Sequence, residues 1–247
     1  MTVPLLLRHA PQSLVEKVPR NHLEPDAVWH RRRRVVAGTL ALGTGLLGRS
    51  LSAEPDSKDF YGLTMGVAAT WLAGGFGSGP LHLGRQRGAR DVLTRPVVAP
   101  VATGVAAFAA FYGFALVARR IPVLDHAISS VLSYADEGST PLVMLTTLAN
   151  GAAEEVFFRG ALYAAVGVQH PVALSTAAYT ATTVATRNPA LVLAAGVMGT
   201  LFGLQRRASG GIQAPLLTHL TWSTLMLRFL PPLFGRNLAG KGEGARH

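Results

Sequence analysis

Three charged residues interrupt an otherwise apolar stretch of the sequence, and their types could support proton transfer. Glu154, Glu155 and Arg159 lie within residues 149–163, most of whose other side chains are small or apolar. Glu155 and Arg159 are four residues apart, so in a helix they face each other and can pair. Glu154 projects about 100° away around the same helix and lacks such a local partner. It is therefore free to face a cavity as a base or a ligand.

The free-energy cost of placing these charges in a membrane indicates what surroundings they need. One charged side chain at the centre of a bilayer costs about 2.5–3.5 kcal/mol or more, so three within six residues require pairing, a water-filled cavity, or both. The alternative interpretation is that all three lie at the membrane surface as a solvated helix end. Their position near the end of an apolar stretch keeps that alternative open.

A second polar group stands in another apolar stretch, residues 214–226. His219 is surrounded there by leucine, threonine and tryptophan, and Ser223 follows one helical turn later on the same face. A single histidine in an apolar helix is often a hydrogen-bonded core residue. The candidate carboxylate site elsewhere in the chain strengthens the functional interpretation of His219.

These residues need elements to position them, and the sequence supplies long apolar blocks. Residues 97–118 contain 22 residues without one charge, which at about 1.5 Å per residue cover the roughly 30 Å hydrocarbon core of a bilayer. A soluble helical protein accounts poorly for this block, because a buried helix usually keeps a polar edge. We therefore predict an all-α polytopic membrane helix bundle of about seven transmembrane helices, at 35–48, 60–83, 97–118, 140–153, 171–186, 189–204 and 210–227.

The charges favour the same class of protein. The chain has 23 basic and 13 acidic residues, a net charge of +10, and only 15% charged residues. Basic residues at 31–34 and 85–95 alternate with an acidic connection at 54–59, which by the positive-inside rule places the N-terminus in the cytoplasm. Arg206 and Arg207 then fall on the same side, whereas Arg119 and Arg120 fit less well. The charges form no basic stripe with interleaved aromatics, so a nucleic-acid partner is not expected.

The remaining segments divide the chain. We predict a polar cytoplasmic leader at 1–34, N-terminal membrane helices and an interfacial helix at 35–136, a core at 137–234 and a polar tail at 235–247. Arg31–Arg34 before an apolar run also resembles a twin-arginine signal, but Leu51 does not fit a cleavage site ending at Ala53. Small residues spaced for close helix packing occur at Gly62 and Gly66 and at Ala195, Gly199 and Gly203.

The charged motif and the histidine together resemble a known family. The pattern Glu154-Glu155-x-x-x-Arg159 on a membrane helix, followed by His219 in Ala-Pro-Leu-Leu-Thr-His, is similar to the CPBP group. These are the CAAX prenyl endopeptidase (Rce1-like) and bacteriocin-processing, or Abi, membrane proteins. The resemblance covers roughly residues 140 to 230, and the helices before it match only as membrane helices.

The resemblance implies roles for these residues. Glu154 would activate water for attack on a peptide carbonyl, with Glu155 and Arg159 as its supporting pair. His219 would stabilise the oxyanion or, if the enzyme is a metalloprotease, bind zinc together with Glu154. The expected partners are the lipid bilayer and a peptide or prenylated protein substrate.

Two positions depart from the family pattern. The middle motif, F-x-x-x-H, aligns best with residues 179–183, so Tyr179 stands for the aromatic and Thr183 for the histidine. Threonine is a neutral hydroxyl without useful proton affinity near neutral pH and a poor zinc ligand. Ser223 stands where asparagine is typical, and His170 lies only at the loop end of the helix.

Three functional hypotheses follow. The first is a CPBP-type intramembrane endopeptidase, and the second is a catalytically impaired relative that uses the polar cavity to bind a partner helix or lipid. A small proton-coupled transporter is the weakest, because the sequence shows neither further intramembrane carboxylates nor inverted repeats. The chain has no cysteine, so any metal would need carboxylate and histidine ligands.

Overall fold

The computed structural model describes residues 25–87, 92–167 and 169–234, and in these residues the chain is all-α apart from one short ribbon. Most of the predicted leader and the whole predicted tail lie outside the described residues. Strands β1 (Gln86–Arg87) and β2 (Leu93–Thr94) pair antiparallel. The helices are α2 (Asp26–Ser50), α3 (Lys58–Gly77), α4 (Val98–Ala118), α5 (Pro122–Glu137), α6 (Thr140–Glu154), the π-helix η2 (Glu155–Leu162), α7 (Tyr163–Ala165), α8 (Pro171–Val184), α9 (Pro189–Ser209), α10 (Gln213–Phe229) and α11 (Pro231–Phe234).

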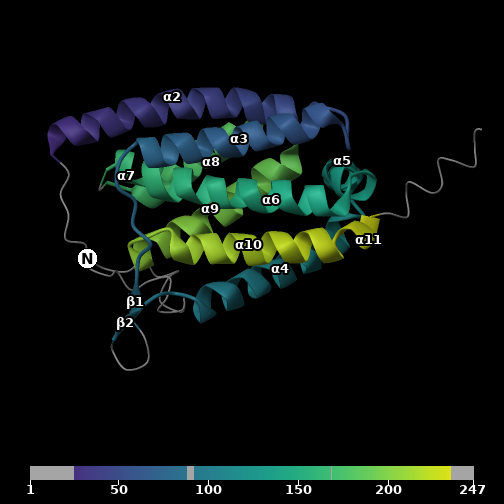
Figure 1. Ribbon diagram of the computed structural model, residues 1–247. Helices are drawn as coiled ribbons and strands as arrows, with labels where there is room; N and C mark the ends of the chain where they lie inside the picture. The colour runs from purple at the N-terminus through teal and green to yellow at the C-terminus, as the bar shows by residue number, and fades with distance from the viewer. Residues whose placement is uncertain (1–24, 88–91, 168, 235–247) are drawn as a thin grey trace, which may run out of the picture.

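The long helices run side by side as a layered bundle (Figure 1). Helices α2 and α3 pack together along one side, and α3 also packs on α6 and η2. Helix α10 packs against α6, α9 and α4, so α6 and α10 lie at the centre of the bundle. Helix α8 pairs with α9, while α5 and α11 close the end opposite to the β-ribbon (Figure 1).

An aromatic cluster joins α3 to the π-helix at the core. Trp71 stacks on Phe157 with ring centroids 4.7 Å apart and tilts against Phe158 at 5.1 Å. Gly43 on α2 allows this packing, because a Cβ there would lie 2.2 Å from the Trp71 ring. The cluster buries the helix segment that carries the charged motif.

Local signals in the sequence explain where several helices begin. Ser57 accepts a hydrogen bond from the Phe60 amide at the start of α3, and Asn188 caps α9 by accepting from the amides of Ala190 and Leu191. Such caps satisfy amides that have no partner inside the helix. Prolines occupy the first turn of α5, α6, α8 and α9, where a missing amide proton costs nothing.

Each predicted apolar block contains a helix, although block 60–83 leaves α3 after Gly77 and block 210–227 enters α10 only at Gln213. The number of these helices that span a membrane is not confirmed. Among the described residues, only Val98–Ala118 and Pro189–Ser209 are long and apolar enough to cross a membrane by length and composition. Helix α8 has 14 residues, or roughly 21 Å at 1.5 Å per residue, and α6 has 15 but continues directly into η2 and α7 as far as Ala165. The first predicted helix also starts earlier than expected, because α2 already begins at Asp26 and includes the arginine run.

The predicted small-residue packing holds for only one of the two segments. A Cβ at Gly199 would lie 3.2 Å from Thr176 and Tyr179, and one at Gly203 would lie 3.0 Å from Val172, so these glycines bring α9 close to α8. The prediction for Gly62 and Gly66 is wrong: no described atom lies within 4 Å of the place for their Cβ. These two glycines lie on a face of α3 that no described helix covers closely.

The segment after α3 is hydrogen-bonded to the corner between α9 and α10. The amides of Ile212 and Gln213 donate to the carbonyls of His82 and Leu83, at 2.9 and 3.0 Å, and the Arg85 amide donates to the Ser209 carbonyl at 2.8 Å. A Cβ on Gly211 would collide with this backbone. The N-terminal half of the chain therefore fixes the start of α10, the helix that carries His219.

Candidate active site

The helix carrying the charged motif changes geometry at the motif itself. Helix α6 ends at Glu154 and the π-helix η2 begins at Glu155 without a break in the chain. Short π segments inside helices occur frequently at functional sites, since they cost stability and redirect side chains. Here the change of geometry separates the two carboxylates: Glu154 is half-buried and Glu155 is fully buried.

Glu155 is the centre of a buried charged cluster. Its Oε1 accepts a hydrogen bond from Arg159 Nη1 at 3.2 Å and contacts His219 Nδ1 at 2.8 Å. The exposed fractions of the Glu155 and Arg159 side chains are 0% and 1%. The predicted pairing of these two residues is confirmed, and a solvated helix end is excluded for both.

Aromatic rings hold the Arg159 guanidinium in place. Its Cζ lies 4.5 Å from the centroid of the Tyr179 ring and 4.9 Å from that of Phe202. Phe202 in turn stacks on the His219 imidazole at 4.8 Å. Cation–π contacts gain strength when water is excluded, so these rings partly compensate the cost of burying the charge. Helices α8, α9 and α10 each contribute one ring to this arrangement.

Glu154 has a hydrogen-bond partner that the sequence did not predict. The Tyr179 hydroxyl donates a hydrogen bond of 2.6 Å to Glu154 Oε2, and no described residue hydrogen-bonds the other oxygen, Oε1. The sequence predicted that Glu154 would lack a local helical partner, and this partner comes instead from α8. Because Glu154 lines a cavity, Oε1 is the oxygen available to water or a ligand.

His219 has one ring nitrogen engaged and one available. Its Nδ1 contacts Glu155 Oε1, which favours a proton on Nδ1. A Cβ on Gly151 would lie 3.5 Å from Nε2, so the glycine leaves space beside that nitrogen. His219 and Ser223 both line the cavity from α10.

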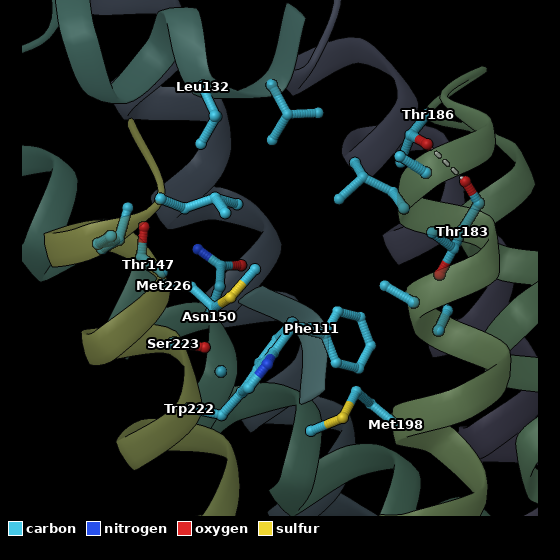
Figure 2. A pocket seen from close by; sticks show the side chains of 18 of the residues that line it. Phe111, Leu132, Thr147, Asn150, Thr183, Thr186, Met198, Trp222, Ser223 and Met226 are labelled. Carbon is cyan, nitrogen blue, oxygen red and sulfur yellow. Dashed lines mark hydrogen bonds between the residues drawn. The ribbon is translucent and has the colours of Figure 1, made fainter. Parts of the chain in front are cut away.

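The cavity brings together residues that the sequence proposed separately. It has a volume of about 660 Å³, and Glu154, Thr183, His219 and Ser223 all contribute to its wall. Figure 2 shows Thr183 on α8 and Ser223 on α10, on opposite sides of the space. Glu155 and Arg159 lie behind this wall, not on it. The rest of the lining is largely apolar and includes Phe111, Leu132, Met198 and Trp222.

Thr183 occupies the cavity in place of a histidine. Its hydroxyl donates to the Tyr179 carbonyl at 2.9 Å, and its own carbonyl accepts from Thr186 at 2.7 Å (Figure 2). His170 is exposed at the N-terminus of α8 and does not line the cavity. Among the described residues, His219 is the single histidine in the wall.

The side chains present do not fit a zinc site. Catalytic zinc takes three protein ligands and keeps one position for water. In the described part of the chain, no group of three or more histidine and acidic side chains could hold a metal ion. Glu154 and His219 supply two ligands, and the near oxygen of Glu155 already binds Arg159 and His219. A metal ion bound by Glu154 and His219, the two expected ligands, would therefore lack a third ligand among the described residues.

Sequence reasoning missed two residues beside the site. By its position in the sequence Arg206 flanks a membrane helix, but it is buried and its Nε donates to the Arg159 carbonyl at 2.5 Å. The sequence pattern identifies Tyr179 only as the aromatic of the middle motif. The signal available in the sequence was a tyrosine where the motif has phenylalanine, because its hydroxyl can form a hydrogen bond.

Comparison with known proteins agrees with the motif. Residues 136–225 match the family model of the type II CAAX prenyl endopeptidase Rce1-like proteins. No curated protein and no solved structure is similar enough to this chain to count as a match. The matched family consists of membrane proteases. All the charged and polar residues proposed for the site lie inside the matched segment 136–225, and this match agrees with the resemblance that the diglutamate motif predicted.

Proposed function

We propose that this chain is an intramembrane endopeptidase of the CPBP type that hydrolyses a peptide bond near a membrane. The observation that carries the proposal is the shared cavity: Glu154 and His219 face one space of about 660 Å³ inside the family-matched region. The CAAX-like or other membrane substrate would bind there, in a multi-pass protein of the cell membrane with a cytoplasmic N-terminus.

Glu154 is the general base in this proposal. The Tyr179 hydroxyl holds Oε2, and Oε1 takes a proton from water in the cavity as the water oxygen attacks the peptide carbonyl. The same proton then passes from Glu154 to the leaving amine nitrogen as the C–N bond breaks. One water is consumed, and one carboxyl and one amine product are released.

His219 is the oxyanion donor. Glu155 accepts from Nδ1 and stabilises a protonated imidazole, whose Nε2–H then donates to the carbonyl oxygen as it gains charge. Arg159 is a second cation beside Glu155, and with the Glu154 carboxylate the formal charges of the four groups sum to zero. No metal enters these steps, in keeping with the two-ligand donor set.

Reconstituted full-length protein provides the test. We expect it to cleave a quenched fluorescent peptide, offered with and without a prenyl group, and Glu154→Gln to lower kcat/KM by about 10²-fold or more, the usual range for loss of a general base. Glu137→Gln is the matched control, because Glu137 is an exposed carboxylate at the end of α5. Equal cleavage by wild type and Glu154→Gln would overturn the proposal.

One observation favours a second function. Thr183 stands in the cavity wall where the family motif has histidine, and the lining is mostly apolar, as a binding site for a lipid or partner helix would be. A catalytically impaired binding protein would show no cleavage of any peptide offered. It would also retain the same co-purified lipid or protein in Glu154→Gln as in wild type, measured by native mass spectrometry.

A further inference from the structure

We infer that Tyr179 is a positioning residue for Glu154. The family motif has a histidine one helical turn later, at position 183. Tyr179 supplies from α8 the polar contact to Glu154 that Thr183 does not make. The inference rests on the proposed function and gives a polar role to a position where the motif has a phenylalanine. Tyr179 and Thr183 lie four residues apart on α8, and both line the cavity with Glu154. Of the two, Tyr179 makes the contact to the carboxylate.

The hydroxyl of Thr183 is already used. It donates to the Tyr179 carbonyl at 2.9 Å, a bond within its own helix, and a hydroxyl has one proton to donate. The phenol of Tyr179 donates to Glu154 Oε2 at 2.6 Å. A phenylalanine at position 179, as in the family pattern, would leave that oxygen without this donor. The substitution pattern Y-x-x-x-T thus keeps one donor on the same face of α8.

The Tyr179 ring is held on several sides, which makes its hydroxyl a fixed donor. Phe158 meets the ring edge-on with centroids 4.7 Å apart, and the Arg159 guanidinium lies over its face at 4.5 Å. Gly199 on α9 makes room for the ring, because a Cβ there would lie 3.2 Å from Tyr179 Cδ1. A donor locked by packing fixes the orientation of its acceptor without further ordering during the reaction.

The consequence concerns the free oxygen of Glu154. A glutamate side chain with one oxygen held by a rigid donor presents the other oxygen in one direction. For Glu154 that is Oε1, and Glu154 and His219 both line the cavity. Loss of the phenol would let the carboxylate rotate, so the Glu154 base would remain but its Oε1 would no longer be held in one orientation.

The test restores the family pattern in two steps. We expect Tyr179→Phe to lower kcat by about 10–100-fold with KM changed less than about 2-fold, since Tyr179 orients the base and does not select the substrate. Adding Thr183→His to give the double variant Y179F/T183H should recover at least part of the lost kcat. Tyr112→Phe on α4 is the control, because no described residue hydrogen-bonds its hydroxyl and it does not line the cavity.

Full activity of Tyr179→Phe would overturn the inference, and so would a double variant no faster than Tyr179→Phe alone. A second measurement does not depend on cleavage. Thermal unfolding midpoints of Tyr179→Phe, Glu154→Gln and their combination should be non-additive if the hydrogen bond is formed, and additive midpoints would refute it. If wild type cleaves nothing, the proposed function fails, and this unfolding cycle alone decides whether Tyr179 holds Glu154.

Discussion

Removing Arg159 alone should destabilise the protein more than removing Arg159 and Glu155 together. Arg159→Met leaves the Glu155 carboxylate, which is 0% exposed, with His219 as its remaining described partner. Its Oε2 already has no hydrogen-bond partner in the described structure. Breaking a buried ion pair from one side costs about 3–5 kcal/mol, because an uncompensated charge stays behind. We expect Arg159→Met to fall in this range.

The double variant Glu155→Gln/Arg159→Met removes both charges and keeps the volumes nearly unchanged. Glutamine can still accept from His219 Nδ1, and methionine can still pack between the rings of Tyr179 and Phe202. Replacement of a whole buried ion pair by groups of similar volume is often close to neutral. The double variant should therefore be more stable than Arg159→Met, although it lacks one more native side chain.

Thermal unfolding in detergent, followed by tryptophan fluorescence, measures both effects. For a chain of this size about 1 kcal/mol shifts the midpoint by roughly 2–4 °C, so Arg159→Met should unfold roughly 6–20 °C below wild type. Arg228→Met is the matched control, because Arg228 is an exposed arginine on α10 near Phe229, and its midpoint should stay near that of wild type. A double variant that unfolds at or below the midpoint of Arg159→Met would refute the argument.

Three further results are expected. Gly151→Ala should fold normally, because its Cβ would make an ordinary 3.5 Å contact with His219, but should lower kcat/KM about 10-fold by filling the space beside Nε2 in the cleavage assay. Gly43→Ala should lower the free energy of unfolding by about 1–3 kcal/mol through a clash with Trp71, whereas Gly45→Ala, with nothing within 4 Å, should not, and equal denaturation midpoints would contradict this. Chelators should leave cleavage unchanged because the described residues offer no group of three metal-binding side chains, and recovery by added zinc would show otherwise.

Helical periodicity sufficed to predict the contacts within one helix. The Glu155–Arg159 pair follows from their spacing of four residues, which the structure shows at 3.2 Å. Apolar block lengths predicted the helices themselves, including Val98–Ala118 to within one residue. Both are local properties that a single stretch of sequence contains.

Contacts between helices could not be predicted in the same way. The partner of Glu154 comes from α8 and one partner of Glu155 comes from α10, at 25 and 64 residues' separation. Arg206 shows the same limit, since by position it flanks a membrane helix and by packing it holds the Arg159 carbonyl. A charged residue at a helix end can flank a membrane span or bind a neighbouring helix, and only its three-dimensional neighbours distinguish these two roles.

The residues that the family model matches and the residues that line the cavity overlap only in part. The polar residues proposed for the site, from Glu154 to Ser223, lie inside the matched segment 136–225. Much of the apolar wall comes from before it, with Phe111 on α4 and Leu132 on α5 as examples. In a mostly apolar pocket, a few placed polar groups fix the orientation of a ligand, and the apolar side chains bury most of its surface. Under the proposed function, the motif supplies the reacting groups, and residues of α4 and α5 before the matched segment supply much of the apolar surface that a substrate would contact.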